Sequence, residues 1–329
     1  MALAKQWLTA VTSNTVGSRM ITLLERLQKE RPNLLRVLTY HQIEELDGFD
    51  QQMGFLARHY HVASMESVLE AIGGGDPLPP RSVLITFDDA YRNFTECAWP
   101  VLKKYGHPVT LFVPTAFPDR PEQIFWWDRL RYAFRHTGRR DTLQTPIGGL
   151  SLATDEQRRQ AYQRLNQYLE KLPHSEVLAW TYQLCHELDT SQPVSQVLSW
   201  DELRTLASEG VTLGAHSRTH PFMDQLTSQE AQAEAVGSLQ DLEREVGQAS
   251  PIFAYPGGRF REDIVQALRR AGFVLAFTTI RGVNDLCRTD PLRLRRINIG
   301  REATLPVLRA RLLHASWYLN QLRPLTQAN

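Results

Sequence analysis

The chain has 329 residues, 22% of which are charged, and its formal net charge at pH 7 is +1. One large domain fits this length, because α/β barrels often run to about 200–250 residues as a single unit. The nearly neutral balance argues against electrostatic capture of nucleic acid or of acidic membranes. Cys97, Cys185 and Cys287 share no close spacing, and we expect reduced thiols rather than a disulfide framework.

Residues 1–34 carry apolar side chains at helical spacing up to Pro32, which predicts an N-terminal helical segment. Packing on the rest of the protein is its default role, with a membrane surface or a partner as alternatives. The segment lacks the continuous apolar region of a secretory signal. We also find no run of the ~18–20 apolar residues that a spanning helix needs. The sequence therefore predicts a cytoplasmic protein and leaves peripheral membrane association open.

An apolar run at residues 83–87 predicts a buried strand that ends on two carboxylates, Asp88 and Asp89. Charge beside a buried strand is costly unless it is paired or bound to a metal. Such strand ends are where α/β folds build their sites, although many strands simply end in a solvated acid. A helix at residues 98–105 and a strand at 109–113 follow. This strand–helix–strand order predicts parallel α/β architecture.

Between residues 117 and 198 the alternation stops, and a mostly helical insertion is predicted. A capping-box pattern at residues 154–157 opens one helix, and a second helix covers about residues 175–188. Trp126 and Trp127 precede both helices. Their indole rings could stack on sugar rings or could anchor the insertion, and anchoring is the default.

Another buried strand, residues 211–215, leads into His216 and His220. If the strand continued, four residues at ~3.3 Å each would hold the histidines ~13 Å apart, too far for one metal ion. In a helical turn, residues four apart lie ~5–6 Å from each other at Cβ, and Pro221 would help to end that turn. Two imidazoles and one acid would then form an open zinc site, with a surface histidine pair as the alternative.

Capping-box patterns at residues 199–202 and 227–230 predict helices on either side of the histidine strand. The histidines are therefore expected between a strand end and the next helix. Residues 251–258 read as a strand broken by a Pro-Gly-Gly turn, which permits close backbone approach to a ligand. An ordinary turn would use the same residues.

Three motifs thus occur in order: Thr-Phe-Asp-Asp at residues 86–89, His-Ser-x-x-His at 216–220 and Phe-x-Tyr-Pro-Gly-Gly at 253–258. Together they resemble the polysaccharide deacetylases, also called the NodB-homology domain or carbohydrate esterase family 4. The Tyr-His pair at residues 40–41 resembles the first strand of one branch. The string Trp-Trp-Asp-Arg-Leu at residues 126–130 is similar to deacetylases of bacterial exopolysaccharide assembly.

The resemblance implies an α/β fold, a distorted (β/α)7 barrel at residues 35–315 that includes the insertion. Residues 316–329 would be a tail. It also implies a divalent metal and hydrolysis of an N-acetyl group, or sometimes an O-acetyl group, on an acetylated saccharide.

Carried over by the resemblance, Asp89, His216 and His220 would be the metal ligands. Asp88 would be the general base, and the backbone N–H of Tyr255 would face the developing oxyanion. The ligand set suits Zn²⁺, although Co²⁺, Ni²⁺, Mn²⁺ or Fe²⁺ could occupy similar ligands. Substrate contacts are expected from Pro256, Gly257, Trp126, Trp127 and Arg296.

Two features depart from the family pattern. The arginine before the third motif is missing, since residues 252–254 are Ile-Phe-Ala, and Arg296 on a late strand could replace it. The late Leu-x-His motif, which carries the general acid, is not clearly present. His314 resembles it but falls in a predicted helix at residues 307–322. His41, at the end of a strand, is the other candidate acid.

Three alternatives to a deacetylase remain. A zincin peptidase is disfavoured because Ser217, not Glu, follows the first histidine. A glycosyltransferase could hold a metal and a sugar nucleotide on Asp88 and Asp89, but it leaves the histidine pair unexplained. A non-catalytic saccharide-binding relative fits the altered third motif but not the retained Asp88. The sugar, the acyl group and the oligomeric state are not defined by the sequence.

Overall fold

The computed structural model describes residues 15–191, 193–247, 249–301 and 303–313. The chain divides into two compact units: Ala116–Val197, called the insertion here, and the chain before and after it, called the barrel unit. Each unit is described by itself. Within the described part of the chain, no helix is both long enough and apolar enough to span a membrane.

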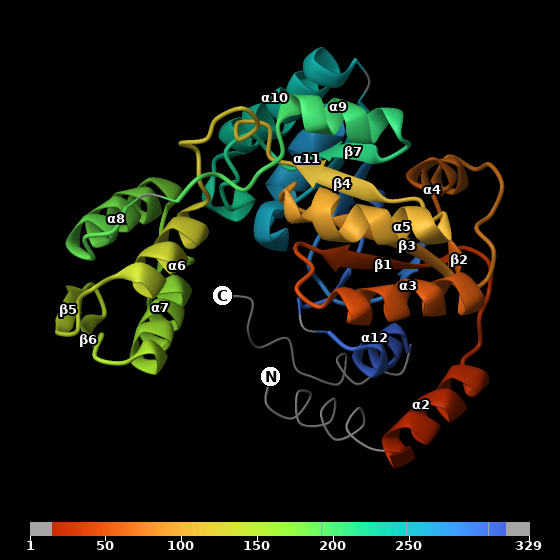
Figure 1. Cartoon of the computed structure of the whole chain (residues 1–329). Helices are drawn as coiled ribbons and strands as arrows, with labels where there is room; N and C mark the ends of the chain where they lie inside the picture. The colour runs from red at the N-terminus through yellow and green to blue at the C-terminus, as the bar shows by residue number, and fades with distance from the viewer. Residues whose placement is uncertain (1–14, 192, 248, 302, 314–329) are drawn as a thin grey trace. The chain divides into compact units, whose positions relative to one another are not determined.

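A curled parallel sheet forms the centre of the barrel unit (Figure 1). Its strands are almost wholly buried, as expected for parallel strands covered on both faces. The strands predicted at residues 83–87, 109–113 and 211–215 are confirmed to within one residue at each end. In spatial order the parallel strands are β1 (Leu34–Tyr40), β3 (Ser82–Phe87), β4 (Thr110–Val113), β7 (Thr212–Ala215), β8 (Ile252–Ala254) and β9 (Leu275–Phe277).

A short stretch near the end of the described chain, residues 294–298, joins the two ends of this sheet; we call it the closing segment. Leu294 forms a parallel bridge to Phe277 in β9. β11 (Ile297–Asn298) pairs in parallel with β1. The sheet therefore curls back toward its first strand, which confirms the distorted barrel. Two further strands, β10 (Asn284–Asp285) and β2 (His61–Val62), pair with β1 and β3 respectively.

Helices surround the sheet (Figure 1). The capping boxes predicted at Ser199 and Thr227 are confirmed, each with both reciprocal hydrogen bonds. The helix predicted at residues 98–105 begins with a π-helical turn, Phe94–Ala98. The α-helices are α2 (Thr15–Leu27), α3 (Leu46–His59), α4 (Met65–Ile72), α5 (Trp99–Tyr105), α9 (Trp200–Ser208), α10 (Ser228–Val246), α11 (Glu262–Arg270) and α12 (Leu305–Leu312).

The helix predicted at residues 307–322 is confirmed as far as Leu312, where α12 ends, but it is wrong at Leu313, which adopts an extended conformation. Leu313 leaves the helix and is buried with Ile21 of α2 and Ala310. Apolar spacing alone carries no sign of this end. The remainder of the predicted helix, His314 included, lies outside the described residues, as do residues 1–14 and the predicted tail.

The insertion has an apolar core of its own. Its described residues form the helices α6 (Trp126–His136), α7 (Asp155–Leu169) and α8 (His174–Glu187), and a hairpin that was not predicted, β5 (Thr142–Thr145) with β6 (Gly148–Ser151). The capping box at Thr154 is confirmed. Trp126 is 5% exposed within this core, so it offers no open ring face to a sugar. Trp127 stacks on Phe125, with 4.5 Å between ring centroids.

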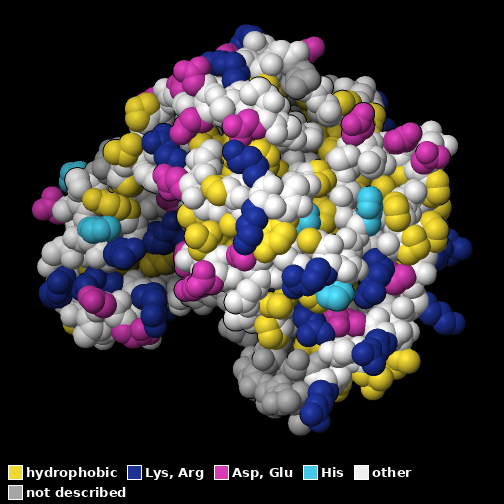
Figure 2. Space-filling view, turned by 45° about the vertical axis from the view of Figure 1, so that its right-hand side comes forward, with side chains coloured by type: hydrophobic (Ala, Val, Ile, Leu, Met, Phe, Trp, Pro, Cys, Tyr) yellow, Lys and Arg dark blue, Asp and Glu magenta, His cyan; other side chains and the backbone are white. Residues whose placement is uncertain are grey.

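Both signs of charge are interspersed over the face shown in Figure 2, with hydrophobic side chains in separate small groups. This mixed face agrees with the nearly neutral net charge of the chain.

Candidate active site

The two acids of the first motif follow β3 at the point where the chain leaves the sheet. The Asp88 N–H still donates to the Tyr40 carbonyl, at 3.0 Å. Asp89 and Ala90 then both adopt positive φ angles, 71° and 48°. Such left-handed backbone costs roughly 1–3 kcal/mol for each non-glycine residue and persists only where the surroundings enforce it. Because of this sharp turn, the two adjacent carboxylates are buried and do not face solvent.

His216 and His220 follow β7, and their rings lie together, with 4.8 Å between centroids. The helical turn considered from the sequence is not what joins them. The linking residues form an irregular loop in which Ser217 and His220 have φ angles of 61° and 59°. The Ser217 hydroxyl accepts the N–H of His220 at 3.0 Å and so tightens the loop. Two residues with left-handed backbone angles thus bring the two imidazoles together, as a helical turn was expected to do.

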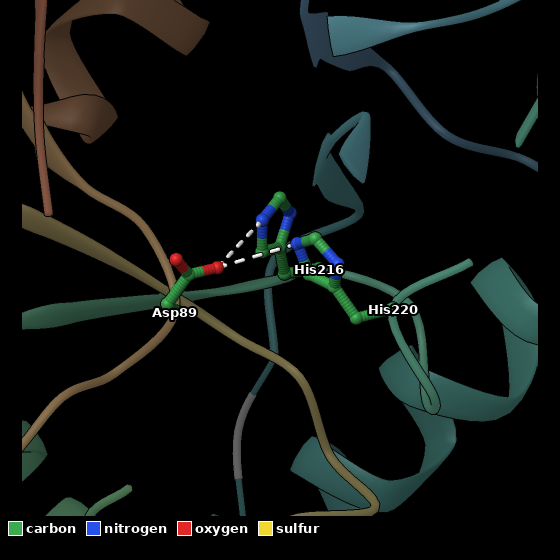
Figure 3. Close-up of side chains that lie close together, drawn as sticks. All are labelled: Asp89, His216 and His220. Atoms are coloured by element: carbon green, nitrogen blue, oxygen red, sulfur yellow. Dashed lines mark ion pairs between the residues drawn. The ribbon is translucent and has the colours of Figure 1, made fainter. Parts of the chain in front are cut away.

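Asp89 points at both imidazoles (Figure 3). Its Oδ1 lies 3.4 Å from Nε2 of His216 and 3.3 Å from Nε2 of His220. That oxygen is buried and has no hydrogen-bond partner among the described residues. His216 Nδ1 lies 2.8 Å from the Ala254 carbonyl, so Nδ1 carries the proton and Nε2 presents its lone pair. Two imidazole nitrogens and one carboxylate are the donor set of a catalytic zinc site.

The pKa values of Asp89, His216 and His220 are shifted by burial and by the neighbouring charges. Burial alone would raise the pKa of Asp89, but the two imidazoles hold that pKa well below its usual value. Burial would lower the pKa of His216, yet the Asp88 and Asp89 carboxylates raise it. The pKa of His220 is lowered, mainly by burial. Asp89 is therefore ionised and ready to act as a ligand.

Arg296, from the closing segment, forms a two-pronged ion pair with Asp88. Its Nη1 and Nη2 each donate to one carboxylate oxygen at 2.8 Å. Its Nε donates to the Thr278 carbonyl at 2.9 Å. Both partners are buried, with Arg296 1% and Asp88 3% exposed. Burial would raise the pKa of Asp88, but the Arg296 guanidinium, together with the His216 and His41 imidazoles, keeps that pKa below its usual value.

A guanidinium that fixes an ionised carboxylate beside a potential metal site fits a hydrolase. The family model for polysaccharide deacetylases matches residues 75–276. The chain belongs to the polysaccharide deacetylase family.

Curated relatives agree with this assignment. The chain is 22% identical to YxkH of Bacillus subtilis (strain 168), whose name places it among the polysaccharide deacetylases, over 77% of this chain and 67% of that protein. It is 27% identical to the poly-β-1,6-N-acetyl-D-glucosamine N-deacetylase of Escherichia coli (strain K12), over 32% of this chain but only 18% of that enzyme.

The fold is similar to that of IcaB from Ammonifex degensii, with a TM-score of 0.57 at 19% identity, covering 85% of this chain and 97% of that one. The Streptococcus pyogenes deacetylase PplD, solved in complex with acetate, gives a TM-score of 0.57 at 20% identity, covering 86% and 99%.

The third motif of this family member corrects one expectation. The backbone N–H of Tyr255 already donates to the Phe277 carbonyl in the sheet, at 3.0 Å, so it is not available to an oxyanion. Pro256 has no N–H, and the Gly258 N–H donates to the Tyr255 carbonyl. Within the described residues, the N–H of Gly257 donates to no acceptor. Ladder pairing of Tyr255 could not be read from the motif, because it depends on where β8 ends.

Position 258 in this turn requires glycine. Its φ is 70°, and a Cβ atom built there would lie 2.3 Å from the backbone nitrogen of Thr279. Only glycine can therefore bring this turn so close to the chain after β9. Pro256 is buried beside it, whereas Gly257 is exposed.

His41 follows β1, which pairs with β3, the strand that leads into Asp88 and Asp89. A positive charge on His41 would lower the pKa of both Asp88 and Asp89, which places the imidazole within electrostatic reach of both. The side chain is partly exposed, so it is accessible from solvent. His41 therefore stays a candidate acid, while His314 cannot be compared with it because it lies outside the described residues.

Arg218, in the loop between the two histidines, pairs with Asp241 of α10 through Nε at 2.7 Å and Nη2 at 2.8 Å. Asp241 also accepts from Thr115 and Arg244. Burial would raise the pKa of Asp241, but these donors lower it to about 2. A lowered carboxyl pKa stabilises the fold above the unfolded pKa of ~4, and this contribution is lost as the pH falls toward 2.

We expect Asp241→Asn to lower the free energy of unfolding at pH 7 by about 1–2 kcal/mol, with allowance for screening around the half-exposed arginines. The difference from wild type should shrink between pH 4 and pH 2. Urea unfolding followed by circular dichroism at several pH values measures it. A difference that stayed constant down to pH 2 would show that the charge of Asp241 is not the cause.

Proposed function

We propose that this protein is a metal-dependent N-deacetylase acting on an acetylated poly- or oligosaccharide of the exopolysaccharide type. The observation that carries the proposal is the buried Asp88–Arg296 pair directly beside the convergent Asp89, His216 and His220. A saccharide-binding relative would not need a buried, ionised carboxylate next to three potential ligands. The N-deacetylase named among the relatives supports the choice of an N-acetylated sugar.

A divalent metal held by Asp89, His216 and His220 would polarise the acyl oxygen and lower the pKa of a water molecule. Asp88 takes a proton from the attacking water. Arg296 keeps Asp88 ionised at neutral pH and fixes its orientation through two hydrogen bonds. Each carboxylate oxygen retains a second lone pair, so the ion pair leaves capacity to accept that proton.

Two further groups complete the reaction. The N–H of Gly257 donates to the negative charge that develops on the acyl oxygen, a role in which one well-placed donor contributes about 3–4 kcal/mol. When the C–N bond breaks, the departing amine needs a proton. His41 is the proposed donor, because it lies within electrostatic reach of both acids and is partly exposed.

The test is acetate release from β-1,6-linked N-acetylglucosamine oligomers by protein that has been stripped with a chelator and reloaded with Zn²⁺. We expect release of acetate together with an equal amount of free amine, and no release from the stripped protein. An O-acetylated oligomer without N-acetyl groups serves as the comparison substrate. Oligomer binding without acetate release by zinc-loaded protein would refute the enzymatic proposal and favour a binding role.

A further inference from the structure

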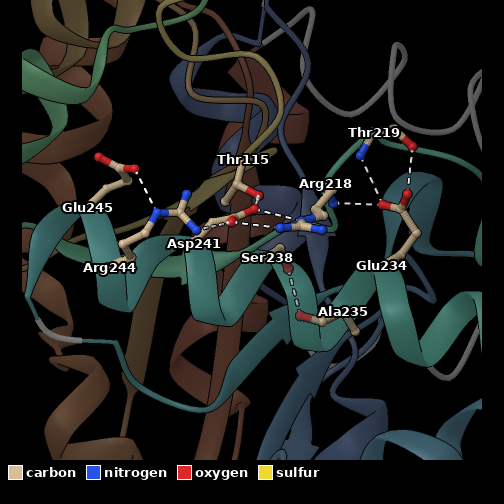
Figure 4. Close-up of polar contacts among 9 residues, drawn as sticks. All are labelled: Thr115, Arg218, Thr219, Glu234, Ala235, Ser238, Asp241, Arg244 and Glu245. Atoms are coloured by element: carbon tan, nitrogen blue, oxygen red, sulfur yellow. Dashed lines mark hydrogen bonds and ion pairs between the residues drawn. The ribbon is translucent and has the colours of Figure 1, made fainter.

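Helix α10 holds the loop between the two histidines from outside the site (Figure 4). Glu234 Oε2 accepts the backbone N–H of Arg218 at 2.7 Å and that of Thr219 at 2.9 Å. Its Oε1 accepts the Thr219 hydroxyl at 2.8 Å. One carboxylate thus binds three donors from two consecutive residues, both of which lie between His216 and His220.

A second carboxylate of α10, that of Asp241, binds the Arg218 side chain, which extends from this loop. Asp241 lies seven residues after Glu234, two helical turns away, and receives the guanidinium of Arg218. Gly237 lies between the two acids in the sequence of α10. A Cβ atom there would come within 2.8 Å of Arg218 Nε, so the glycine leaves room for the arginine along the helix.

The loop needs such support because no regular secondary structure holds it. Ser217 and His220 both have left-handed backbone angles, and the two N–H groups between them would lack these acceptors if Glu234 were shortened. The contacts of the Glu234 side chain go to this loop rather than to α10 itself. The Glu234 carboxylate therefore contacts both of the residues, Arg218 and Thr219, that lead directly into His220.

We propose that Glu234 is a positioning residue, which sets the spacing of His216 and His220 for metal binding, with Asp241 supporting it through Arg218. The proposal rests on the metal dependence of the proposed function. Its readout is metal affinity, which is independent of acetate release.

Three variants separate the position of the carboxylate from its charge. Glu234→Asp keeps the charge but is one methylene too short to reach both N–H groups. Glu234→Gln keeps the length and an oxygen acceptor but loses the charge. Glu243→Gln alters an exposed glutamate of the same helix and serves as the matched control. Zn²⁺ affinity of the stripped proteins is measured by competition with a chromophoric chelator, and urea midpoints are measured in parallel.

We expect Glu234→Asp to weaken Zn²⁺ binding by about 10–100-fold, the usual effect of losing a group that orients metal ligands. Glu234→Gln should stay close to wild type, and Glu243→Gln should equal it. Equal affinities of Glu234→Asp and wild type, or a larger loss in Glu234→Gln than in Glu234→Asp, would overturn the positioning role. A wild-type protein that binds no Zn²⁺ would instead overturn the metal dependence on which the proposal rests.

Discussion

Asp88→Asn is expected to lower kcat by about 10²–10⁴-fold, the usual contribution of a positioned general base, while the protein still binds one metal ion. The amide cannot accept the proton of the attacking water. The substitution leaves the proposed metal ligands unchanged, because it is Asp89, the next residue, that points at the two histidines. Steady-state acetate release and metal content per chain, measured on the same sample, test both parts.

The substitution also disturbs Arg296, which loses its charged partner inside the protein. Breaking a buried ion pair from one side often costs 3–5 kcal/mol, and Asn retains one of the two acceptors. Thermal unfolding of the variant must therefore be compared with wild type, so that a loss of fold is not mistaken for a loss of chemistry. Asp76→Asn, at an exposed position, is the matched control. Full turnover in Asp88→Asn would eliminate Asp88 as the base.

Asp89→Ala is expected to abolish metal binding and activity together. Residues that merely orient ligands change metal affinity by about 10–100-fold, and loss of a direct ligand should exceed that range. The Oδ1 of Asp89 is the atom on which both imidazoles converge, so no neighbouring group replaces it. Metal content after desalting, with Zn²⁺ affinity by chelator competition, measures the loss.

The two aspartate variants form a contrast within one dipeptide. Asp89→Ala should lose the metal, and Asp88→Asn should keep it, although the residues are adjacent and both nearly buried. His220→Ala provides a second ligand variant and should behave like Asp89→Ala. If Asp89→Ala retained stoichiometric, tightly bound metal, the three-residue site would be wrong and the ion would have to lie elsewhere.

Local sequence patterns predicted those parts of the site that are close in sequence. The apolar run before Asp88 and the strand before His216 gave the correct elements, because both strands are buried on two faces. The mutual approach of Asp89 and His216 needed the spatial order of the strands, in which β3, β4 and β7 are neighbours. The family resemblance supplied that order.

The remaining features depend on contacts that no local pattern encodes. Arg296 reaches Asp88 across 208 residues of chain, so it was named as a candidate but could not be placed. Tyr255 was given the wrong role because its N–H belongs to the sheet. The loop from His216 to His220 was expected to be helical. The four-residue spacing of two histidines on one metal ion excludes an extended strand between them, but it does not distinguish a helical turn from an irregular one.

The closing segment both completes the sheet and carries Arg296, the ion-pair partner of Asp88. Its strand pairing with β1 joins the sheet ends, and its Arg296 supplies the countercharge of Asp88, the proposed base. These contacts are among the most non-local in the chain, and such contacts form late when loop closure limits folding. A chain that has assembled β1 to β9 without this segment would lack the guanidinium that pairs with Asp88. Catalytic competence would then arise only with the last strand, so that turnover itself reports on whether the barrel has closed.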